Sequence, residues 1–247
     1  MMFPDYAFGH SHRDFFTEAM AAQGGDVLEQ IAIPPTETSF LRYFPQIPRE
    51  TEVLYHVMVG PAVLTFVREM GEFFGTSGPQ IFGFLDSLEA VDLASPGLEF
   101  LSGTYFWEGH PRYAGPDQTA EDAFYRERVG VDASGASISD PADISTYSHM
   151  FGCWETLFII KRGMEACDYQ GPDDRQALTE AVEAMTAMPL SNEHPQGAKV
   201  FNGKTHQVFG HQYISQVGDD GALSVVHTTS IEDGLYPDEV DYSEMPF

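Results

Sequence analysis

The stretch Met1-Met2-Phe3-Pro4-Asp5-Tyr6-Ala7-Phe8-Gly9 is the part of the sequence that decides the fold. Its first three residues form a short apolar run, the next six form a turn, and a helical pattern follows from about Ser11 to Gln23. An apolar stub, a turn and an amphipathic helix make the second half of a strand-turn-helix unit. The chain therefore begins as the interior of an α/β protein does, and we expect Met1 to be an internal methionine of a longer protein.

The rest of the first hundred residues alternates between short apolar runs and helical patterns. Such alternation builds parallel sheets that are covered by helices on both faces. The sequence therefore predicts the α/β class with a doubly wound sheet. Strands are expected at residues 27–33, 52–59, 80–85 and 98–106, and helices at residues 38–44, 61–74 and 87–93.

The second half of the chain has a different character. Two β-hairpins are expected near its end, one at Asn202-Gly203 and one at the turn of residues 218–221. The final residues, 233–247, are acidic and are expected to form a solvated tail. Helices are predicted at residues 120–128, 144–166 and 174–188, a surface loop at 129–143, and strands at 207–217 and 222–229.

The charge of the chain is strongly negative. It has 12 Lys and Arg against 38 Asp and Glu, a formal net charge of −26 at pH 7. Such a field repels phosphate backbones and anionic lipids, so we expect no nucleic acid and no membrane surface as a partner. No stretch approaches the roughly 20 apolar residues of a membrane span, and no signal peptide is visible. A saline source and an ordinary acidic extracellular protein both fit this composition.

No motif in the sequence predicts catalysis or a metal site. The 9 histidines form no HExxH pair and no short-spaced cluster with cysteine, so we expect no metal and no cofactor. Asp86 follows a predicted strand, at the edge where open α/β sheets bind ligands, and the loops at residues 4–9 and 59–61 open at the same edge. Two interpretations of Asp86 stay open: a ligand contact, or an acid that stabilises the start of the next helix.

The order and spacing of these segments resemble those of type I periplasmic binding proteins, the solute receptors of ABC transporters for branched-chain amino acids and amides (leucine-binding-protein-like). Asp5-Tyr6-Ala7-Phe8-Gly9 looks like the family's turn before the first helix of lobe two. Residues 34–43, 52–74, 144–166 and 199–226 are similar to further segments in the family's order. The resemblance implies a periplasmic-binding-protein-like I fold with two doubly wound, Rossmann-like lobes.

The family's first lobe-one segment has no counterpart in this sequence, so the resemblance implies a chain that lacks its N-terminal third. Residues 1–106 would be lobe two without its first strand, and residues 107–204 would be the returning part of lobe one. Residues 205–247 would return to lobe two and end in the acidic tail. Lobe one would be incomplete and would expose apolar surface, so we expect self-association or a partner chain.

The resemblance also implies which residues meet the solute between the lobes. Asp86 aligns with an acid that binds the ammonium group in amino-acid members, whereas Val59 and Gly60 stand where those members place an aromatic side chain. Tyr147 falls near the lobe-one contact with the ligand. Two further contacts are expected, one where the chain crosses between lobes and one in the opening turn: Trp107 and Tyr6.

These features predict an extracytoplasmic substrate-binding component of an ABC uptake transporter. It would bind amino acids, amides or similar small polar solutes in a cleft that closes about a hinge, and would not be an enzyme. Its partners would be the solute and an ABC permease, with no insertion into the membrane; the full-length protein would be periplasmic or extracellular. The alternative is a ligand-sensing regulator or receptor domain of the same fold, and a third hypothesis is a small doubly wound enzyme that uses Asp86.

Overall fold

The computed structural model describes residues 1–75, 77–88, 90–144, 147–235 and 241–244, without the side chains of residues 86, 87, 147, 148 and 244. The chain divides into two compact units. Unit 1 comprises residues 1–108 and 214–226, and unit 2 comprises residues 109–213 and 227–247. The backbone therefore passes between the units at residues 108–109, 213–214 and 226–227. Both units share the closing region 205–247, and the assignment of segments to lobes stays a prediction.

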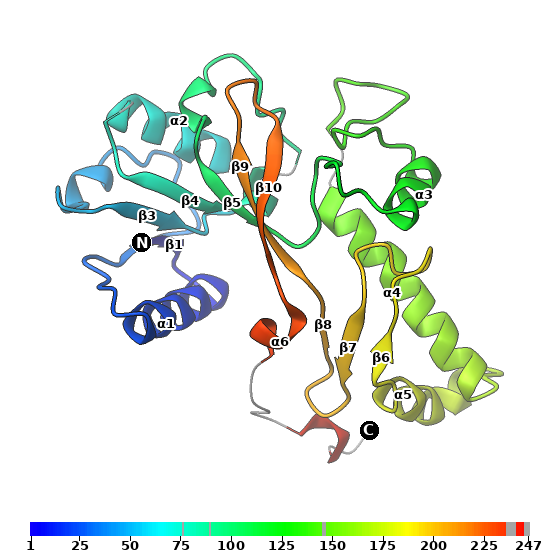
Figure 1. Ribbon diagram of the computed structural model, residues 1–247. Coiled ribbons are helices and arrows are strands. Elements are labelled where there is room, and N and C mark those ends of the chain that lie inside the picture. The colour runs from blue at the N-terminus through cyan, green and yellow to red at the C-terminus, as the bar shows by residue number, and fades with distance from the viewer. Residues whose placement is uncertain (76, 89, 145–146, 236–240, 245–247) are drawn as a thin grey trace. The chain divides into compact units, whose positions relative to one another are not determined.

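A seven-stranded sheet is built around unit 1, in the order β10-β9-β5-β4-β3-β1-β2 (Figure 1). The first five strands of the chain pair in parallel, as the doubly wound class requires. The hairpin of β9 and β10 turns at residues 218–221, as the sequence predicts. The strands are β1 (Met2–Pro4), β2 (Ile31–Ile33), β3 (Val53–His56), β4 (Gln80–Phe84), β5 (Tyr105–Glu108), β9 (Gln212–Val217) and β10 (Leu223–Thr229).

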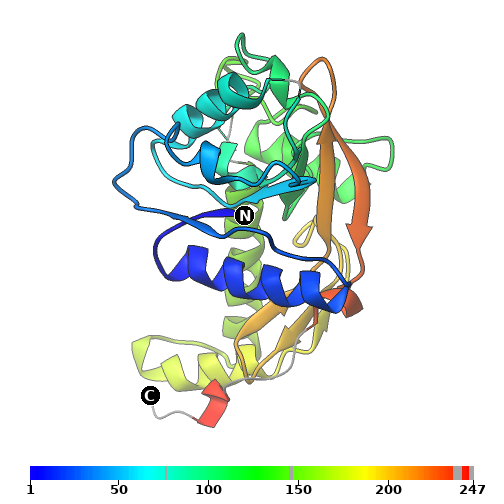
Figure 2. The same ribbon diagram turned by 90° about the vertical axis from the view of Figure 1, so that its left-hand side faces the viewer.

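Helices α1 (Ala7–Ala22) and α2 (Val63–Phe74) cover opposite faces of this sheet (Figures 1 and 2). The neighbouring residues Tyr55 and His56 of β3 point to opposite faces because side chains alternate along a strand. Phe16 of α1 stacks on Tyr55 with ring centroids 4.3 Å apart. Phe66 of α2 contacts His56 on the other face, with ring centroids 5.2 Å apart. The two apolar helix faces therefore enclose the sheet.

Helix α1 begins at Ala7, earlier than the predicted start near residue 11. Its N-cap, Tyr6, has extended backbone and makes no side-chain cap hydrogen bond, so the usual sequence mark of a helix start is missing. Gly9 allows this early start, because a Cβ at Gly9 would lie 2.0 Å from the carbonyl oxygen of Pro4. The first turn of α1 thus lies directly against the end of β1.

The predicted helix at residues 38–44 is wrong. A turn precedes a 3-10 helix at Phe44–Gln46. The carboxylate of Glu69, on α2, accepts hydrogen bonds from the Ser39 hydroxyl (3.1 Å), from the Phe40 amide and from the Leu41 amide (3.2 Å). The carboxylate of a residue far away in the chain therefore fixes the backbone of this turn. The structure also differs from the predicted helix at residues 87–93 and the predicted strand at residues 98–106. Short 3-10 helices occupy Leu85–Leu88 and Glu99–Leu101, and β5 begins only at Tyr105.

In its described residues, unit 2 contains four α-helices and a small antiparallel sheet, β6-β7-β8. Helix α5 ends before the predicted residue 188, because residues 187–188 pair with β7 as β6. Gly163 of α4 packs closely on α5, since a Cβ there would lie 2.7 Å from a methyl carbon of Val182. The elements are α3 (Ala120–Val129), α4 (Tyr147–Ala166), α5 (Arg175–Glu183), β6 (Ala187–Met188), β7 (Lys199–Asn202), β8 (Gln207–Phe209), α6 (Ile231–Gly234) and 3-10 helices at Pro172–Asp174 and Tyr242–Glu244.

One face of α4 carries exposed apolar side chains at helical spacing. Leu157 is 67% exposed, Ile160 43% and Met164 36%, and Cys153 lies one turn before them. Such a stripe usually marks a packing surface. Self-association through it stays a prediction. None of the helices in the described ranges has both the length and the apolarity that a membrane crossing needs.

Candidate functional site

The strand order points to one edge of the unit 1 sheet. Its parallel strands lie in the order β2-β1-β3-β4-β5, so the chain runs from β1 to one side and then returns to the other side at β3. In open α/β sheets, ligands bind at the carboxyl ends of the strands where the order reverses in this way. The loops at this point are residues 5–6 after β1 and residues 57–62 after β3.

The structure brings five of the six predicted site residues to the carboxyl end of the strands. Tyr6, at the end of the first loop, is 42% exposed. Val59 and Gly60 lie in the second loop, and Gly60 has φ +97, a conformation that favours glycine. Asp86 lies in the 3-10 helix directly after β4, and Trp107 is the penultimate residue of β5.

The side chains of two predicted residues lie outside the described part of the structure. These are Asp86 and Tyr147; the latter is the first residue of α4, in unit 2. Both interpretations of Asp86, a ligand contact and a helix-stabilising acid, therefore stay open. Contact of the six predicted residues with a solute also stays a prediction.

Four aromatic side chains, Tyr6, Phe8, Phe84 and Trp107, line this edge; we call them the edge cluster. Phe84 stacks on Trp107 with centroids 4.9 Å apart, and Phe8 lies 6.1 Å from both Phe84 and Tyr6. Val59 and Trp107 pack against the same buried residues, Phe84 among them. Sequence reasoning missed Phe8 and Phe84, although Phe84 lies one residue before the end of the predicted strand 80–85 and could have been found by the same rule as Asp86.

Polar side chains of α1 adjoin the edge cluster. The ring of His12 lies 4.5 Å from that of Phe8, and its Nδ1 is 3.2 Å from the hydroxyl of Tyr55. Burial lowers the pKa of His12 and raises the pKa of Tyr55 to about 12, so both are uncharged at neutral pH. His10 Nε2 lies 2.9 Å from a carboxylate oxygen of Asp5 at the start of the helix. The aromatic wall is therefore backed by the uncharged His12 and Tyr55 and adjoins the His10–Asp5 pair.

Two helices begin at this edge without an acidic residue in their first turns. The N-cap residues, Tyr6 of α1 and Ala62 of α2, make no side-chain cap hydrogen bond. The first amides of a helix lack partners within it, and its N-terminus carries partial positive charge. Uncapped helix starts beside an aromatic wall suit a ligand that combines an apolar ring with an anionic group.

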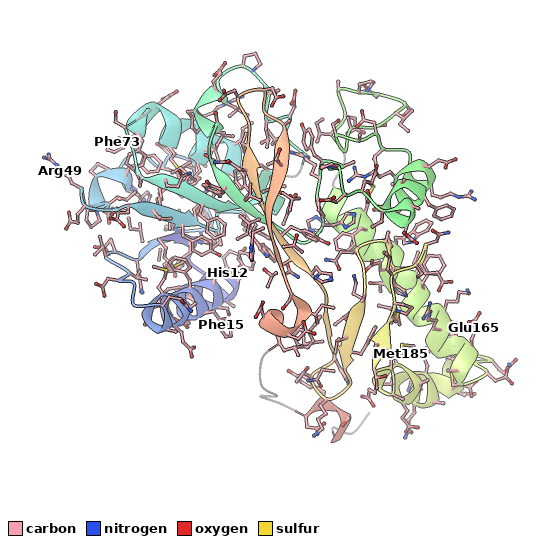
Figure 3. All side chains as sticks on the ribbon, viewed as in Figure 1. His12, Phe15, Arg49, Phe73, Glu165 and Met185 are labelled. Carbon is pink, nitrogen blue, oxygen red and sulfur yellow. The ribbon has the colours of Figure 1, made fainter. Side chains whose placement is uncertain are left out.

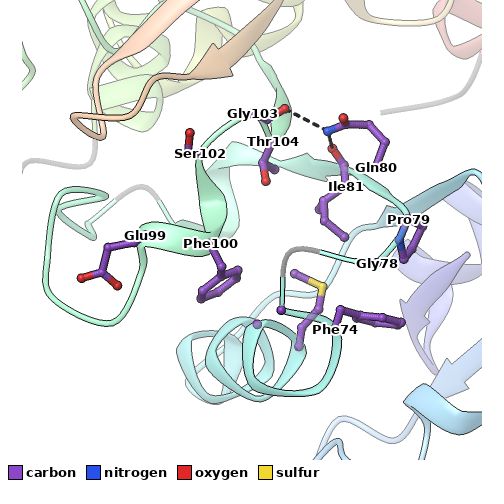
Figure 4. A pocket seen from close by; sticks show the side chains of 13 residues that line it. Phe74, Gly78, Pro79, Gln80, Ile81, Glu99, Phe100, Ser102, Gly103 and Thr104 are labelled. Atoms are coloured by element: carbon purple, nitrogen blue, oxygen red, sulfur yellow. Dashed lines mark hydrogen bonds between the residues drawn. The ribbon is translucent and has the colours of Figure 1, made fainter.

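A separate cavity of about 360 Å³ lies at the amino ends of β4 and β5, the opposite end of these strands (Figure 4). Met70, Phe74 and Phe100 contribute apolar walls, and Gln80 Nε2 donates to the carbonyl of Gly103 at 2.9 Å. None of the six predicted site residues lines this cavity. Across the described residues, no three His, Cys, Asp or Glu side chains gather as metal ligands would.

Comparison with known proteins gives a family and a fold. The family model described as "Periplasmic binding protein" matches residues 1–222. An ABC transporter substrate-binding protein from Sphaerobacter thermophilus has a TM-score of 0.72 at 19% identity, over 95% of this chain and 60% of that one. A solute binding protein from Rhodopseudomonas palustris HaA2, solved with p-hydroxybenzoic acid, scores 0.71 at 16% identity, over 93% and 59%. No curated protein matches the sequence.

The leucine-, isoleucine-, valine-, threonine- and alanine-binding protein from Brucella ovis scores 0.69 at 12% identity, over 96% of this chain and 58% of that one. These likenesses confirm the predicted fold class, and the chain spans about three fifths of the length of these relatives. The family consists of solute-binding transport components that are not enzymes, which argues against the enzyme hypothesis. The chain belongs to the periplasmic binding protein family, and its fold is that of the type I members.

Proposed function

We propose that the chain forms part of the extracytoplasmic solute-binding component of an ABC uptake transporter. Its partners are a small-molecule solute and the membrane permease. The observation that carries the proposal is the carboxyl edge of the unit 1 sheet, where the strand order reverses and the edge cluster lies. Open α/β sheets bind their ligands at this place, and the family match supports solute capture there.

The sequence predicts amino acids, amides or similar small polar solutes, and the edge favours aromatic carboxylates among them. Aromatic rings stack on one another or meet edge to face, and Trp107 and Tyr6 offer such faces. The uncapped starts of α1 and α2 suit a carboxylate. Two relatives were solved with p-hydroxybenzoic acid and 3,4-dihydroxy benzoic acid, whereas the relative from Brucella ovis is named for amino acids.

Replacing Trp107 with alanine should weaken the binding of 4-hydroxybenzoate about 10-fold. The reason is the loss of an aromatic contact worth roughly 1.5 kcal/mol, which corresponds to a factor of ten in affinity. Isothermal titration calorimetry with 4-hydroxybenzoate, leucine and a small amide measures this effect. Tyr6→Ala repeats the test at a side chain that is 42% exposed, and so leaves the core intact.

Phe15→Ala is the matched control for both variants. Phe15 lies on the exposed side of α1 and is 64% exposed, so its removal should change affinity less than about 2-fold (Figure 3). A folded protein that binds none of the three solutes would contradict the proposed function. Tighter binding of leucine than of 4-hydroxybenzoate would overturn only the aromatic preference. Equal effects of Trp107→Ala and Phe15→Ala would show that the edge cluster is not the site.

A further inference from the structure

Unit 2 buries an ion pair that the solute-binding edge of unit 1 does not use. Lys199, one of only three lysines in the chain, is 4% exposed, and its Nζ lies 3.2 Å from an oxygen of Glu155, which is 5% exposed. Burial lowers the pKa of Lys199 and raises that of Glu155, while the partner's charge opposes each shift. Because desolvation consumes most of the attraction of a buried pair, such a pair is a poor source of stability. The contacts of the pair with Gln196 point to a positioning role.

The ion pair holds the buried side chain of Gln196 in one orientation. Glu155 accepts the backbone N–H of Gln196 at 3.1 Å, and Lys199 Nζ donates to Gln196 Oε1. An ammonium group can only donate, so the oxygen of the amide must face Lys199 and the nitrogen must face away. Gln196 Nε2 then donates to two backbone carbonyls, those of Gly109 and of His211 (2.8 Å).

Both carbonyls belong to segments that cross between the units. Gly109 is the first residue of unit 2 after the first crossing, and His211 lies just before the second. Tyr213, the last residue before that crossing, donates its hydroxyl to the carbonyl of Gln196 at 3.2 Å. His211 Nδ1 in turn lies 3.0 Å from the carbonyl of Thr229, just after the third crossing. Gln196 is thus linked, directly or through one residue, to all three crossing segments.

Crossing segments are also held on the unit 1 side. Val217 of β9 accepts a backbone hydrogen bond from Gly103 (2.8 Å) and donates one to Thr104 (2.9 Å), just before β5. The hydroxyl of Ser215, on β9, donates to the carboxylate of Glu108, the last residue of β5. The backbone between these two sets of bonds is short, so any bending concentrates in it.

We propose that Gln196, oriented by the Glu155–Lys199 pair, is a positioning residue that clamps the unit 2 ends of the three crossing segments and confines bending to the residues between the units. The inference rests on the proposed function, because solute capture is what makes bending necessary. A clamp of this kind lowers the number of open conformations that the solute must order, and so raises its affinity.

The test is Gln196→Glu in the whole protein. The glutamate has nearly the same shape and still accepts from Lys199, but its second oxygen cannot donate and faces the carbonyls of Gly109 and His211. Hydrogen exchange of the amides at residues 109–110, 211–213 and 227–229 should accelerate about 10-fold or more, while residues 54–57 of unit 1 keep their rates. Affinity for 4-hydroxybenzoate should fall about 10-fold.

Gln207→Glu is the matched control, because it makes the same charge change at an exposed position of β8 in the same unit. It should leave exchange and affinity unchanged. Faster exchange throughout unit 2 after Gln196→Glu would reveal a merely structural role and overturn the proposal, as would unchanged exchange at the crossing segments. If the wild-type protein binds no solute, the proposed function fails while the exchange data still decide the clamp. If Gln196→Glu does not fold, Gln196→Asn, whose amide is one methylene shorter and cannot reach both carbonyls, is judged by the same criteria.

Discussion

Replacing Asp122 with alanine is expected to lower the unfolding free energy of unit 2 by about 3–5 kcal/mol, the usual cost of removing one partner from a buried ion pair. Asp122, on α3, is 8% exposed and accepts from His110 Nε2 (2.8 Å), Arg126 Nε (2.8 Å) and Gln118 Nε2 (2.8 Å). Burial alone would raise the pKa of Asp122, but the hydrogen bond from His110 and the charge of Arg126 outweigh it and hold the pKa below its usual range. The carboxylate is therefore ionised across the neutral range.

The loss is large because Arg126 stays buried after it has lost the carboxylate to which its Nε donates. Its guanidinium also donates to the carbonyls of Pro111 (2.9 Å), Arg112 (3.0 Å) and Asp132 (3.1 Å), so it cannot move to water without giving up these bonds. Removing one partner from a buried ion pair is among the costliest of single deletions. The double variant Asp122→Leu with Arg126→Met should recover part of the loss, because it removes both charges.

The chain has two tryptophans, Trp107 in unit 1 and Trp154 in unit 2, which makes the measurement specific to one unit. Urea unfolding followed by Trp154 fluorescence in a Trp107→Phe background reports unit 2, since Trp154 packs on Tyr125 of α3 (5.6 Å between centroids). Glu127→Ala, at an exposed position of the same helix, is the control and should change stability by less than about 0.5 kcal/mol. Equal losses in the two variants would mean that the buried pair contributes no more than a surface charge.

The parallel sheet could be predicted from the sequence because each of its strands can be recognised from consecutive residues. Runs such as residues 80–85 and 52–59 are apolar and lie between turn residues, so each identifies a strand on its own. The rule that ligands bind at the carboxyl ends of parallel strands then brings Tyr6, Val59 and Asp86 to one edge, and it needs only the strand order.

What could not be predicted depends on partners far apart in the chain. Gln196 contacts Glu155, Gly109 and His211, and no periodicity or motif connects these positions. The turn at residues 39–41 is likewise held by Glu69, whose carboxylate reaches across from α2. Local propensity is a weak guide wherever a buried or capping side chain comes from another element. His56 is a further case, because it is fully buried and its ring nitrogens have no hydrogen-bond partner within the described ranges.

Acidification from pH 6.5 to about pH 4 should lower the unfolding free energy of unit 1 by about 3 kcal/mol through His56 alone. His56, the last residue of β3, is fully buried between Phe66 and Phe106 and lies over Gly83, where a Cβ would be only 2.6 Å from its Nε2. Neither ring nitrogen has a hydrogen-bond partner among the described residues. Burial therefore lowers the pKa of His56 from 6.5 to about 4.

Stability falls on acidification because the unfolded chain binds a proton at His56 more readily than the folded unit does. Below pH 6.5 this histidine is protonated in the unfolded chain but not in the folded unit. The unfolding free energy therefore keeps its full value above pH 6.5 and falls with pH until the folded pKa near 4 is reached. His12, whose pKa burial also lowers, adds to the loss in the same direction. His56→Leu should flatten this pH dependence, and it should also stabilise unit 1 at pH 7 by about 1–3 kcal/mol, since it removes an unsatisfied buried polar group.

Urea unfolding between pH 4 and 8, followed by Trp107 fluorescence in a Trp154→Phe background, measures the slope for unit 1. Phe106→Leu is the matched control: it changes the packing beside His56 without removing a titrating group, so it should shift the curve downward and leave its slope intact. A slope that survives in His56→Leu would contradict the assignment to this histidine. The slope would then have to come from His12 or the carboxylates, and the burial of an unpaired imidazole under α2 would have no consequence for stability.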